Sequence, residues 1–244
     1  MTLATSIAGK HAVVTGGAKG IGRAIADALA RRGAKVSVMS RTATEYSSAY
    51  ASVDVDVTDE DAVSEAFTSL RERHGPVLIL VNNSGLAESA PVLRTSLQLW
   101  KRTIATNLTA TFLCSQIALA DMLAANFGRI VNIASVAGLS GAPYIVAYAA
   151  SKHGVIGLTR AMAVELQDSG VTVNAVCPGY TESEMLERAI NNVAAKTGKT
   201  TAEARGQLAS MNPGGRMVEP HEVAAAVIEV CESDANGQEI VLPR

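Results

Sequence analysis

The chain has 244 residues, of which 48% are hydrophobic and 18% are charged, and its formal net charge is −2. A chain of this length and hydrophobicity can bury a core, which excludes global disorder and fits one large α/β domain. The balanced charge and the 4% of aromatic residues disfavour nucleic acid as a partner. No uncharged apolar run reaches about 18 residues, so we expect no membrane partner.

The cysteines and histidines form no recognisable disulfide or metal pattern. Cys114, Cys177 and Cys231 are far apart and odd in number, and the four histidines show no HxH or HxxxH spacing. The first residues lack the charged and apolar stretches of a secretory signal. We therefore expect buried thiols, a cytoplasmic location and no bound metal.

Short runs rich in Val, Ile and Leu alternate with longer helical patterns, without a linker or repeat. The expected strands are Lys10–Thr15, Lys35–Ser40, Ala51–Asp56, Val77–Asn82, Arg129–Ser135, Thr172–Cys177 and Gln238–Leu242. The expected helices are Ile21–Arg32, Glu60–His74, Leu97–Asn126, Ala147–Asp168, Glu184–Thr197, Thr201–Ala209 and Pro220–Glu232. Continuous apolar runs are typical of parallel strands covered on both faces. The alternation predicts a single α/β domain over residues 1–244, with a Rossmann-type doubly wound sheet of about seven parallel strands and helices on both faces.

A glycine-rich turn joins the first expected strand to the first expected helix. It reads Thr15-Gly16-Gly17-Ala18-Lys19-Gly20-Ile21-Gly22. Glycines permit a tight turn and a close approach of phosphate to backbone N–H groups, and a helix N-terminus adds a positive end. The position of this turn therefore predicts binding of a nucleotide phosphate, with a purely structural turn as the alternative.

The end of the second expected strand indicates which nucleotide binds. Folds that bind NAD place a carboxylate there to accept hydrogen bonds from the ribose, but this chain has Ser40 followed by Arg41. Arg41 and Lys19 are suited to a ribose 2′-phosphate, although either cation alone reads as a solvated surface charge. We expect NADP(H) as the preferred cofactor, with NAD(H) as the alternative.

One tyrosine and one lysine have a spacing that suits acid–base chemistry. Tyr148 and Lys152 are four residues apart, so on a helix they share a face and the ammonium can lower the pKa of the phenol. Ser135 lies thirteen residues before Tyr148, where its hydroxyl could bond a substrate carbonyl. Asn107 could anchor a water that leads to Lys152. The alternative for the pair is an ordinary amphipathic helix with a surface lysine.

Together these motifs make the chain resemble the short-chain dehydrogenase/reductase family, in its 3-oxoacyl and polyketide ketoreductase or hydroxyacyl dehydrogenase branch. The matching motifs, in order, are Thr15–Gly22, Asp56-Val57, Asn82-Asn83-Ser84-Gly85, Asn107, Ser135, Tyr148-x-x-x-Lys152 and Pro178-Gly179. The chain departs from the family at Ser84, where Ala is usual, and at Ser183, where Thr is common. The connection before the last strand and the tail after it are also shorter than is usual in the family.

The resemblance implies a role for each motif. Tyr148 is the acid/base, Ser135 polarises the carbonyl or alcohol, Lys152 lowers the tyrosine pKa and holds the nicotinamide ribose, and Asn107 holds a relay water. The cofactor-binding residues it implies are Gly16, Lys19, Gly20, Ile21, Gly22, Ser40, Arg41, Asp56, Val57, Asn83, Gly85, Tyr148, Lys152, Pro178, Gly179, Thr181 and Ser183. The substrate contacts it implies are Ser135, Leu139, Tyr144 and Tyr148.

The segment Met185–Met217 resembles the substrate lid of the family, enlarged. Leu186, Ile190 and Leu208 form apolar stripes that could fold over an acyl chain. We expect a mobile lid over residues 185–217, with a permanently packed surface hairpin as the alternative.

The combined prediction is an NADP(H)-dependent oxidoreductase that interconverts a ketone and a secondary alcohol. The expected substrate is a 3-oxoacyl/3-hydroxyacyl or polyketide-type small molecule, carried on CoA or acyl carrier protein. The alternatives are an NAD(P)-dependent dehydrogenase of a small secondary alcohol, sugar or cyclic substrate, and a nucleotide-binding regulator without catalysis. We also expect a homodimer or homotetramer, because two of the expected helices bear more apolar surface than one sheet face needs.

Overall fold

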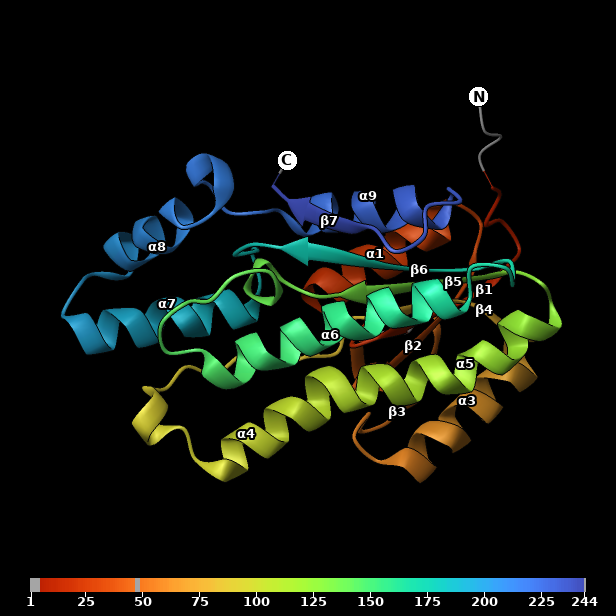
Figure 1. Ribbon diagram of the computed structural model, residues 1–244, viewed down its shortest axis with the longest axis horizontal. Coiled ribbons are helices and arrows are strands. Elements are labelled where there is room, and N and C mark those ends of the chain that lie inside the picture. Colours follow the sequence, from red (N-terminus) through yellow and green to blue (C-terminus); the bar gives the residue numbers. More distant parts are fainter. Residues whose placement is uncertain (1–4, 47–48, 244) are drawn as a thin grey trace.

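The computed structural model describes residues 5–46 and 49–243, and the other positions of the expected domain over residues 1–244 lie outside the described residues. Within these residues one seven-stranded parallel sheet has the order β3-β2-β1-β4-β5-β6-β7 (Figure 1). The strands are β1 (His11–Thr15), β2 (Lys35–Ser40), β3 (Ala51–Asp54), β4 (Val77–Asn82), β5 (Gly128–Ile133), β6 (Val171–Pro178) and β7 (Glu239–Leu242). This arrangement confirms the doubly wound α/β fold.

Helices cover both faces of the sheet (Figure 1). One face carries α1 (Gly20–Arg31) and α9 (Pro220–Cys231). The other carries α3 (Glu60–His74), α5 (Ala110–Ala124) and α6 (Val146–Glu165). The remaining helices are α2 (Ala43–Tyr46), η1 (Val92–Arg94), α4 (Leu97–Ile104), η2 (Ala105–Thr109), η3 (Val136–Gly138), α7 (Glu184–Thr197), α8 (Thr201–Ser210) and η4 (Pro213–Gly215).

Neighbouring residues of the central strands β1 and β4 belong to opposite hydrophobic cores. Val14 and Val81 pack in the core beneath α1 and α9. Val13 and Leu80 pack in the core beneath α3 and α5. Successive side chains of a strand point to opposite faces, so a sheet covered on both sides needs an apolar residue at every position. This requirement explains the continuous apolar runs in the sequence.

The long helix expected over Leu97–Asn126 is interrupted. A π-helical turn, η2, separates α4 from α5 and contains Asn107. The helix ends at Ala124 because Asn126 adopts a left-handed backbone conformation, with φ 49°, that closes the last turn. By length and composition, Leu97–Ala124 is the one described helical stretch that could cross a membrane. In this fold, however, its residues Cys114 and Met122 are buried beside the sheet, as in a core helix.

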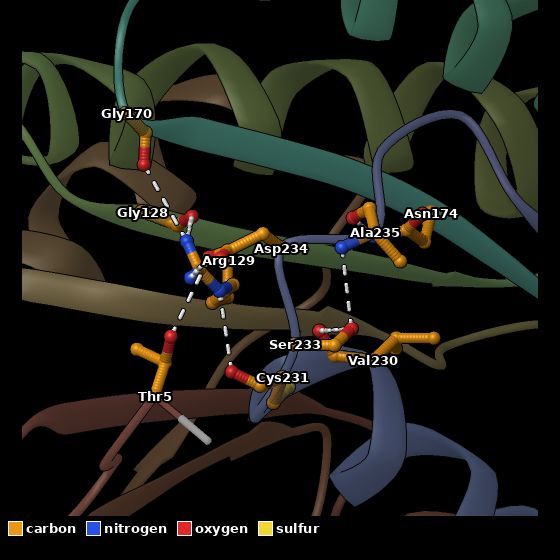
Figure 2. Close-up of polar contacts among 10 residues, drawn as sticks. All are labelled: Thr5, Gly128, Arg129, Gly170, Asn174, Val230, Cys231, Ser233, Asp234 and Ala235. Carbon is orange, nitrogen blue, oxygen red and sulfur yellow. Dashed lines mark hydrogen bonds and ion pairs between the residues drawn. The ribbon is translucent and has the colours of Figure 1, made fainter. Parts of the chain in front are cut away.

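A buried arginine fastens the short connection between α9 and β7 (Figure 2). The guanidinium of Arg129 donates to the carbonyl oxygens of Gly128, Gly170 and Cys231. It also forms an ion pair with Asp234 at 3.3 Å, although the arginine side chain is only 4% exposed and the aspartate is 66% exposed. Arg129 thus ties the start of β5 to the end of α9 and to the turn before β6.

Two asparagine amides hold the rest of the same connection. Asn174 donates from Nδ2 to the carbonyl oxygen of Ala235, 2.7 Å away, and its Oδ1 accepts from the backbone of Gln238. The Oδ1 of Asn236 accepts from the backbone of Val173 at 2.9 Å. Side-chain hydrogen bonds therefore position β7.

The α7–α8 hairpin projects from one end of the molecule, at the left of Figure 1. Leu186, Ile190, Ala204 and Leu208 form a buried cluster of their own. In this structure the two helices use these side chains to pack against each other, and the expectation that Leu186, Ile190 and Leu208 fold over an acyl chain stays a prediction. Whether the hairpin moves stays a prediction.

Candidate active site

The glycine-rich turn between β1 and α1 is shaped so that only glycine fits at key positions. Gly16 and Gly20 have φ of 63° and 52°, which side chains disfavour. A Cβ on Gly22 would come within 2.2 Å of the carbonyl oxygen of Gly16. The Nδ2 of Asn83 donates to the carbonyl oxygens of Thr15 and Gly16, which joins the turn to the end of β4. A tight glycine cradle at a helix N-terminus fits a dinucleotide phosphate.

The start of α7 lies against this cradle. Ser183 caps α7 by accepting a hydrogen bond from the backbone of Leu186, and its Cβ lies 3.9 Å from where a Cβ of Gly20 would stand. Lys19 in the turn is 3.7 Å from Glu184. The structure therefore brings the predicted residues Ser183 and Lys19 together, although about 160 residues separate them.

The predicted 2′-phosphate and adenine residues lie where β2 and β3 end. Hydrogen bonds from Thr58 hold the pKa of Asp56 below its usual value, and the nearby charge of Arg41 adds to this effect. Asp56 is therefore ionised at neutral pH and accepts hydrogen bonds, while Val57 beside it is buried. The last residue of β2, before the exposed Arg41, is Ser40 and not the carboxylate that NAD-binding folds place at this point.

The four predicted catalytic residues come together at the carboxyl ends of β4 and β5. Tyr148 and Ser135 are hydrogen-bonded. The Nζ of Lys152 is 5.7 Å from the ring centre of Tyr148. A Cβ on Gly85 would stand 3.4 Å from Oδ1 of Asn107 and 3.9 Å from Nζ of Lys152. Open α/β sheets bind ligands at this edge.

The pKa of Tyr148 departs from the expected direction. Burial raises the pKa of this phenol, and the hydrogen bond from Ser135 only partly offsets the rise. Burial lowers the pKa of Lys152 to about 8. Burial sets the direction of the tyrosine shift, and the prediction that Lys152 lowers the tyrosine pKa stays a prediction. A phenol with a raised pKa keeps its proton at neutral pH.

Asn107 makes more contacts than the sequence suggested. Its Oδ1 accepts from the backbone N–H of Leu86 at 2.9 Å, and its Nδ2 donates to the carbonyl oxygen of Leu86 and to Oγ of Ser151. The side chain is 1% exposed and thus fixes the backbone after Gly85. Its predicted water stays a prediction.

The predicted substrate contacts Leu139 and Tyr144 lie on the loop before α6. Tyr144 has φ 69°, a rare backbone conformation for a side chain of this size, and its carbonyl oxygen accepts from the backbone of Ala90 at 2.7 Å. Tyr144 also lines a shallow apolar hollow of about 430 Å³ with Pro91 and Val92. Ser135 and Lys152 do not line this hollow, and neither does Leu139.

Pro178 ends β6 beside Ser135, whose Oγ lies 3.4 Å from the carbonyl oxygen of Pro178, and Gly179 follows the strand. Thr181 follows, and its hydroxyl donates to the carbonyl oxygen of Gly179.

Sequence reasoning missed two residues here, Tyr180 and Asn212. The Oδ1 of Asn212 accepts a hydrogen bond from the backbone N–H of Tyr180, and its Nδ2 donates one to the carbonyl oxygen of Tyr180. The position of Tyr180 directly after Pro178-Gly179 was a usable signal, whereas Asn212 carried none.

A doubly wound sheet with a phosphate cradle at its first crossover and a Ser–Tyr–Lys set beside it defines a nucleotide-dependent oxidoreductase. The chain belongs to the short-chain dehydrogenase family, since the family model described as short chain dehydrogenase matches residues 10–194. Family membership and the enzyme class are therefore confirmed.

Known proteins are similar over almost the whole chain. A protein of Streptomyces violaceoruber that carries the name ketoacyl reductase 1 of the granaticin polyketide synthase is 40% identical over 236 residues, covering 92% of this chain and 87% of its own. The 3-oxoacyl-[acyl-carrier-protein] reductase FabG of Vibrio cholerae is 37% identical and covers 94% and 93%. The crystal structure of a variant of actinorhodin polyketide ketoreductase with NADPH has a TM-score of 0.90 and 34% identity, covering 98% and 97%.

Proposed function

We propose that this chain is an NADP(H)-dependent reductase that converts the ketone of a 3-oxoacyl or polyketide-type substrate to a secondary alcohol. The observation that carries the proposal is the half-buried Tyr148 phenol, which is hydrogen-bonded to Ser135 and has the Nζ of Lys152 5.7 Å from its ring centre. A protonated phenol is the form that a ketone reduction consumes. The names of the relatives, a ketoacyl reductase and a 3-oxoacyl-[acyl-carrier-protein] reductase, support the substrate class.

The cofactor fits the cradle described above. The turn around Gly16 and Gly20 would hold the pyrophosphate, Asp56 and Val57 the adenine, and Lys19 with Arg41 the 2′-phosphate. Ile21 lies at the start of α1, directly after the cradle, and Pro178, Gly179, Thr181 and Ser183 lie between the end of β6 and the start of α7. NADPH, when bound, supplies the hydride.

The residues of the chain handle the oxygen of the substrate. Ser135 and Tyr148 each present a hydroxyl to the ketone oxygen, and Tyr148 passes its proton to that oxygen as negative charge develops there. The ammonium of Lys152, 5.7 Å from the ring centre, stabilises the phenolate that remains. Lys152 needs its proton for this role. Asn107 holds the backbone of Leu86 and the hydroxyl of Ser151, and Ser151 is the residue directly before Lys152 in α6.

We further propose that the acyl group is carried on acyl carrier protein or CoA and that the α7–α8 hairpin closes over it. The Nδ2 of Asn192 in α7 donates to Oγ of Ser89, on the loop after β4, at 2.8 Å. This bond joins the hairpin to the loop after β4, and a lid breaks and remakes such a contact as it opens and closes.

A homo-oligomer and a cytoplasmic location also belong to the proposal. Apolar side chains remain exposed on the helices of one face, where Phe112 is 44%, Leu123 is 47% and Val164 is 70% exposed. Such surface favours association with a second copy, which light scattering measures directly. Three buried free cysteines among the described residues suit a reducing compartment.

A substrate panel tests the proposed function. Purified protein is assayed by NADPH absorbance with acetoacetyl-acyl carrier protein, acetoacetyl-CoA, a simple cyclic ketone and, for oxidation, an aldohexose with NAD or NADP. We expect the acetoacetyl thioesters to give the highest kcat/KM, with NADPH preferred over NADH. A preference for the aldohexose would instead support the alternative function of a sugar dehydrogenase. The structure of an aldohexose dehydrogenase of Thermoplasma acidophilum is similar to this chain, with a TM-score of 0.89 and 28% identity.

A further inference from the structure

Two helices beneath the active site, α5 and α6, each carry a fully buried hydroxyl that faces the sheet. These residues are Ser115 of α5 and Thr159 of α6. The Oγ of Ser115 donates to the carbonyl oxygen of Thr111, 2.7 Å away in the same helix. The Oγ1 of Thr159 donates in the same way to the carbonyl oxygen of Val155 at 2.8 Å. A hydroxyl has one proton, so each of these groups can only accept from the sheet.

Two asparagines of the sheet supply the donors. Asn82 ends β4, and Asn132 lies beside it in β5. The Nδ2 of Asn82 donates to Oγ of Ser115 and to Oδ1 of Asn132, both at 2.9 Å. The Nδ2 of Asn132 donates to Oγ1 of Thr159 at 2.9 Å. A chain of side-chain hydrogen bonds therefore runs from α5 through two strands to α6.

The direction of the bonds in this chain follows from the helices. Because Thr159 can only accept, Asn132 turns its Nδ2 toward α6 and its Oδ1 toward Asn82. Asn82 then turns its own Nδ2 toward Asn132, and its Oδ1 stays buried without a hydrogen-bond partner in the described part of the chain. An unpaired buried acceptor costs free energy, which an apolar contact between sheet and helix would avoid. Such a chain is typical of polar groups that are kept for the arrangement they impose.

The Asn132–Thr159 bond joins the two elements that carry the catalytic groups. On β5, Asn132 directly precedes Ile133, and Ser135 follows the end of the strand. The carbonyl oxygen of Ile133 accepts from Nζ of Lys152 at 2.7 Å. On α6, Thr159 lies about two helical turns after Lys152 and therefore on the same face of the helix. The bond thus links the strand that leads to the catalytic serine with the helix that carries the catalytic tyrosine and lysine.

This bond supplies a directional contact that the neighbouring apolar packing lacks. Val155 and Ile156 of α6 pack in a small apolar core between the helix and the sheet. Apolar burial is non-directional, so it sets the distance between helix and sheet more strictly than the position of the helix along the strand. A hydrogen bond weakens steeply as its angle changes. The Asn132–Thr159 bond therefore resists a small sliding or rotation of α6.

We propose that Asn132 and Thr159 are positioning residues whose hydrogen bond sets the register of α6 on β5 and thereby aligns the hydroxyls of Tyr148 and Ser135 on one substrate oxygen. This inference rests on the proposed function, in which both hydroxyls engage the ketone. Asn132 and Thr159 act through the catalytic groups and not on the substrate, because both are fully buried. A misplacement of about 1 Å caused by a mutation far from the reacting atoms can lower the rate about 100-fold.

The variant Thr159→Val removes the hydroxyl and nearly keeps the shape of the side chain. Wild type and variant are compared on acetoacetyl-CoA with NADPH. We expect kcat to fall about 10-fold or more, while KM and the dissociation constant for NADPH change by less than about twofold, because the lost alignment matters only in the transition state. The variant Thr159→Ser keeps the hydroxyl and should retain a kcat within about twofold of wild type.

Ser115→Ala is the matched control. It breaks the same kind of bond, from Asn82, on a helix that carries neither the catalytic tyrosine nor the catalytic lysine. Both Ser115→Ala and Thr159→Val should lower the urea midpoint of unfolding, but Ser115→Ala should keep kcat within about twofold of wild type. If Thr159→Val does not fold, Asn132→Leu combined with Thr159→Val replaces it, since removal of both partners leaves no unpaired donor between them. The same loss of kcat is expected.

Three results would overturn the inference and leave the proposed function in place. They are an unchanged kcat in the folded variant that lacks the Thr159 hydroxyl, an equal loss of kcat in Ser115→Ala, and a loss in Thr159→Ser as large as in Thr159→Val. A wild-type protein that reduces no ketone of the substrate panel with NADPH contradicts the proposed function and this inference with it.

Discussion

The ammonium of Lys152 donates to the main-chain carbonyl oxygen of Ile133, 2.7 Å away, in a position where the lysine is only 5% exposed. Burial lowers the pKa of Lys152 to about 8. A backbone dipole, and not a carboxylate, is therefore the nearest stabiliser of this cation.

The first prediction concerns pH. Below a pKa of about 8 Lys152 is charged and can stabilise the phenolate of Tyr148, and above it the charge is lost. The kcat/KM for ketone reduction should therefore fall as pH rises through about 8. Steady-state assays over a pH series measure this limb. Arginine does not titrate in this range, so Lys152→Arg should lack the limb in whatever activity it retains, and an unchanged limb would assign it to another group.

The second prediction concerns the proton donor. Tyr148→Phe removes the transferable proton and almost no volume, so kcat should fall by about 100-fold to 10,000-fold while NADPH still binds. Stopped assays give kcat, and fluorescence titration gives the dissociation constant for NADPH. A kcat close to that of wild type would reject the acid role.

The third prediction concerns cofactor choice. Ser40→Asp combined with Arg41→Ile adds a carboxylate for the free ribose and removes a cation from the 2′-phosphate. The NADP/NAD ratio of kcat/KM should fall by about 10-fold to 100-fold, the effect of one charged hydrogen bond. Lys19→Ala alone should move the ratio in the same direction by less, because Lys19 also pairs with Glu184. If neither variant changes the ratio, these two cations do not read the phosphate.

The fourth prediction concerns stability. Arg129→Met keeps the volume of the side chain but leaves the carbonyl oxygens of Gly170 and Cys231 without this donor. The free energy of unfolding should fall by about 2–4 kcal/mol. Asp234 is two-thirds exposed, so Asp234→Asn should cost about 1 kcal/mol or less. Urea unfolding of both variants measures the difference, and equal losses would show that the ion pair outweighs the backbone contacts.

The fifth prediction concerns the hairpin. Hydrogen exchange over α7 and α8 should slow when NADPH and a 3-oxoacyl thioester are added, as expected of a lid that closes. Leu186→Ala should speed exchange with and without ligand, because Leu186 packs inside the hairpin. Exchange that is the same in both states would support a permanently packed hairpin.

Much of the fold could be predicted from the sequence because its signals are local. The apolar run Val77–Asn82 and the helix Glu60–His74 have the predicted bounds, since strand and helix periodicities are visible within a few residues. The glycine turn was equally visible, because its conformation depends on the absence of side chains at adjacent positions. The spacing of Tyr148 and Lys152 on one helix also required no distant contact.

Only the tertiary structure decided the properties that depend on burial and on distant partners. The pKa of Tyr148 rises because the fold removes the phenol from water, which a four-residue spacing cannot reveal. Leu186 and Leu208 face each other across the hairpin, because an apolar stripe shows which side is buried but not what buries it. Asn212 reaches Tyr180 across 32 positions of sequence. Such contacts arise when the chain packs, and no local pattern of residues encodes them.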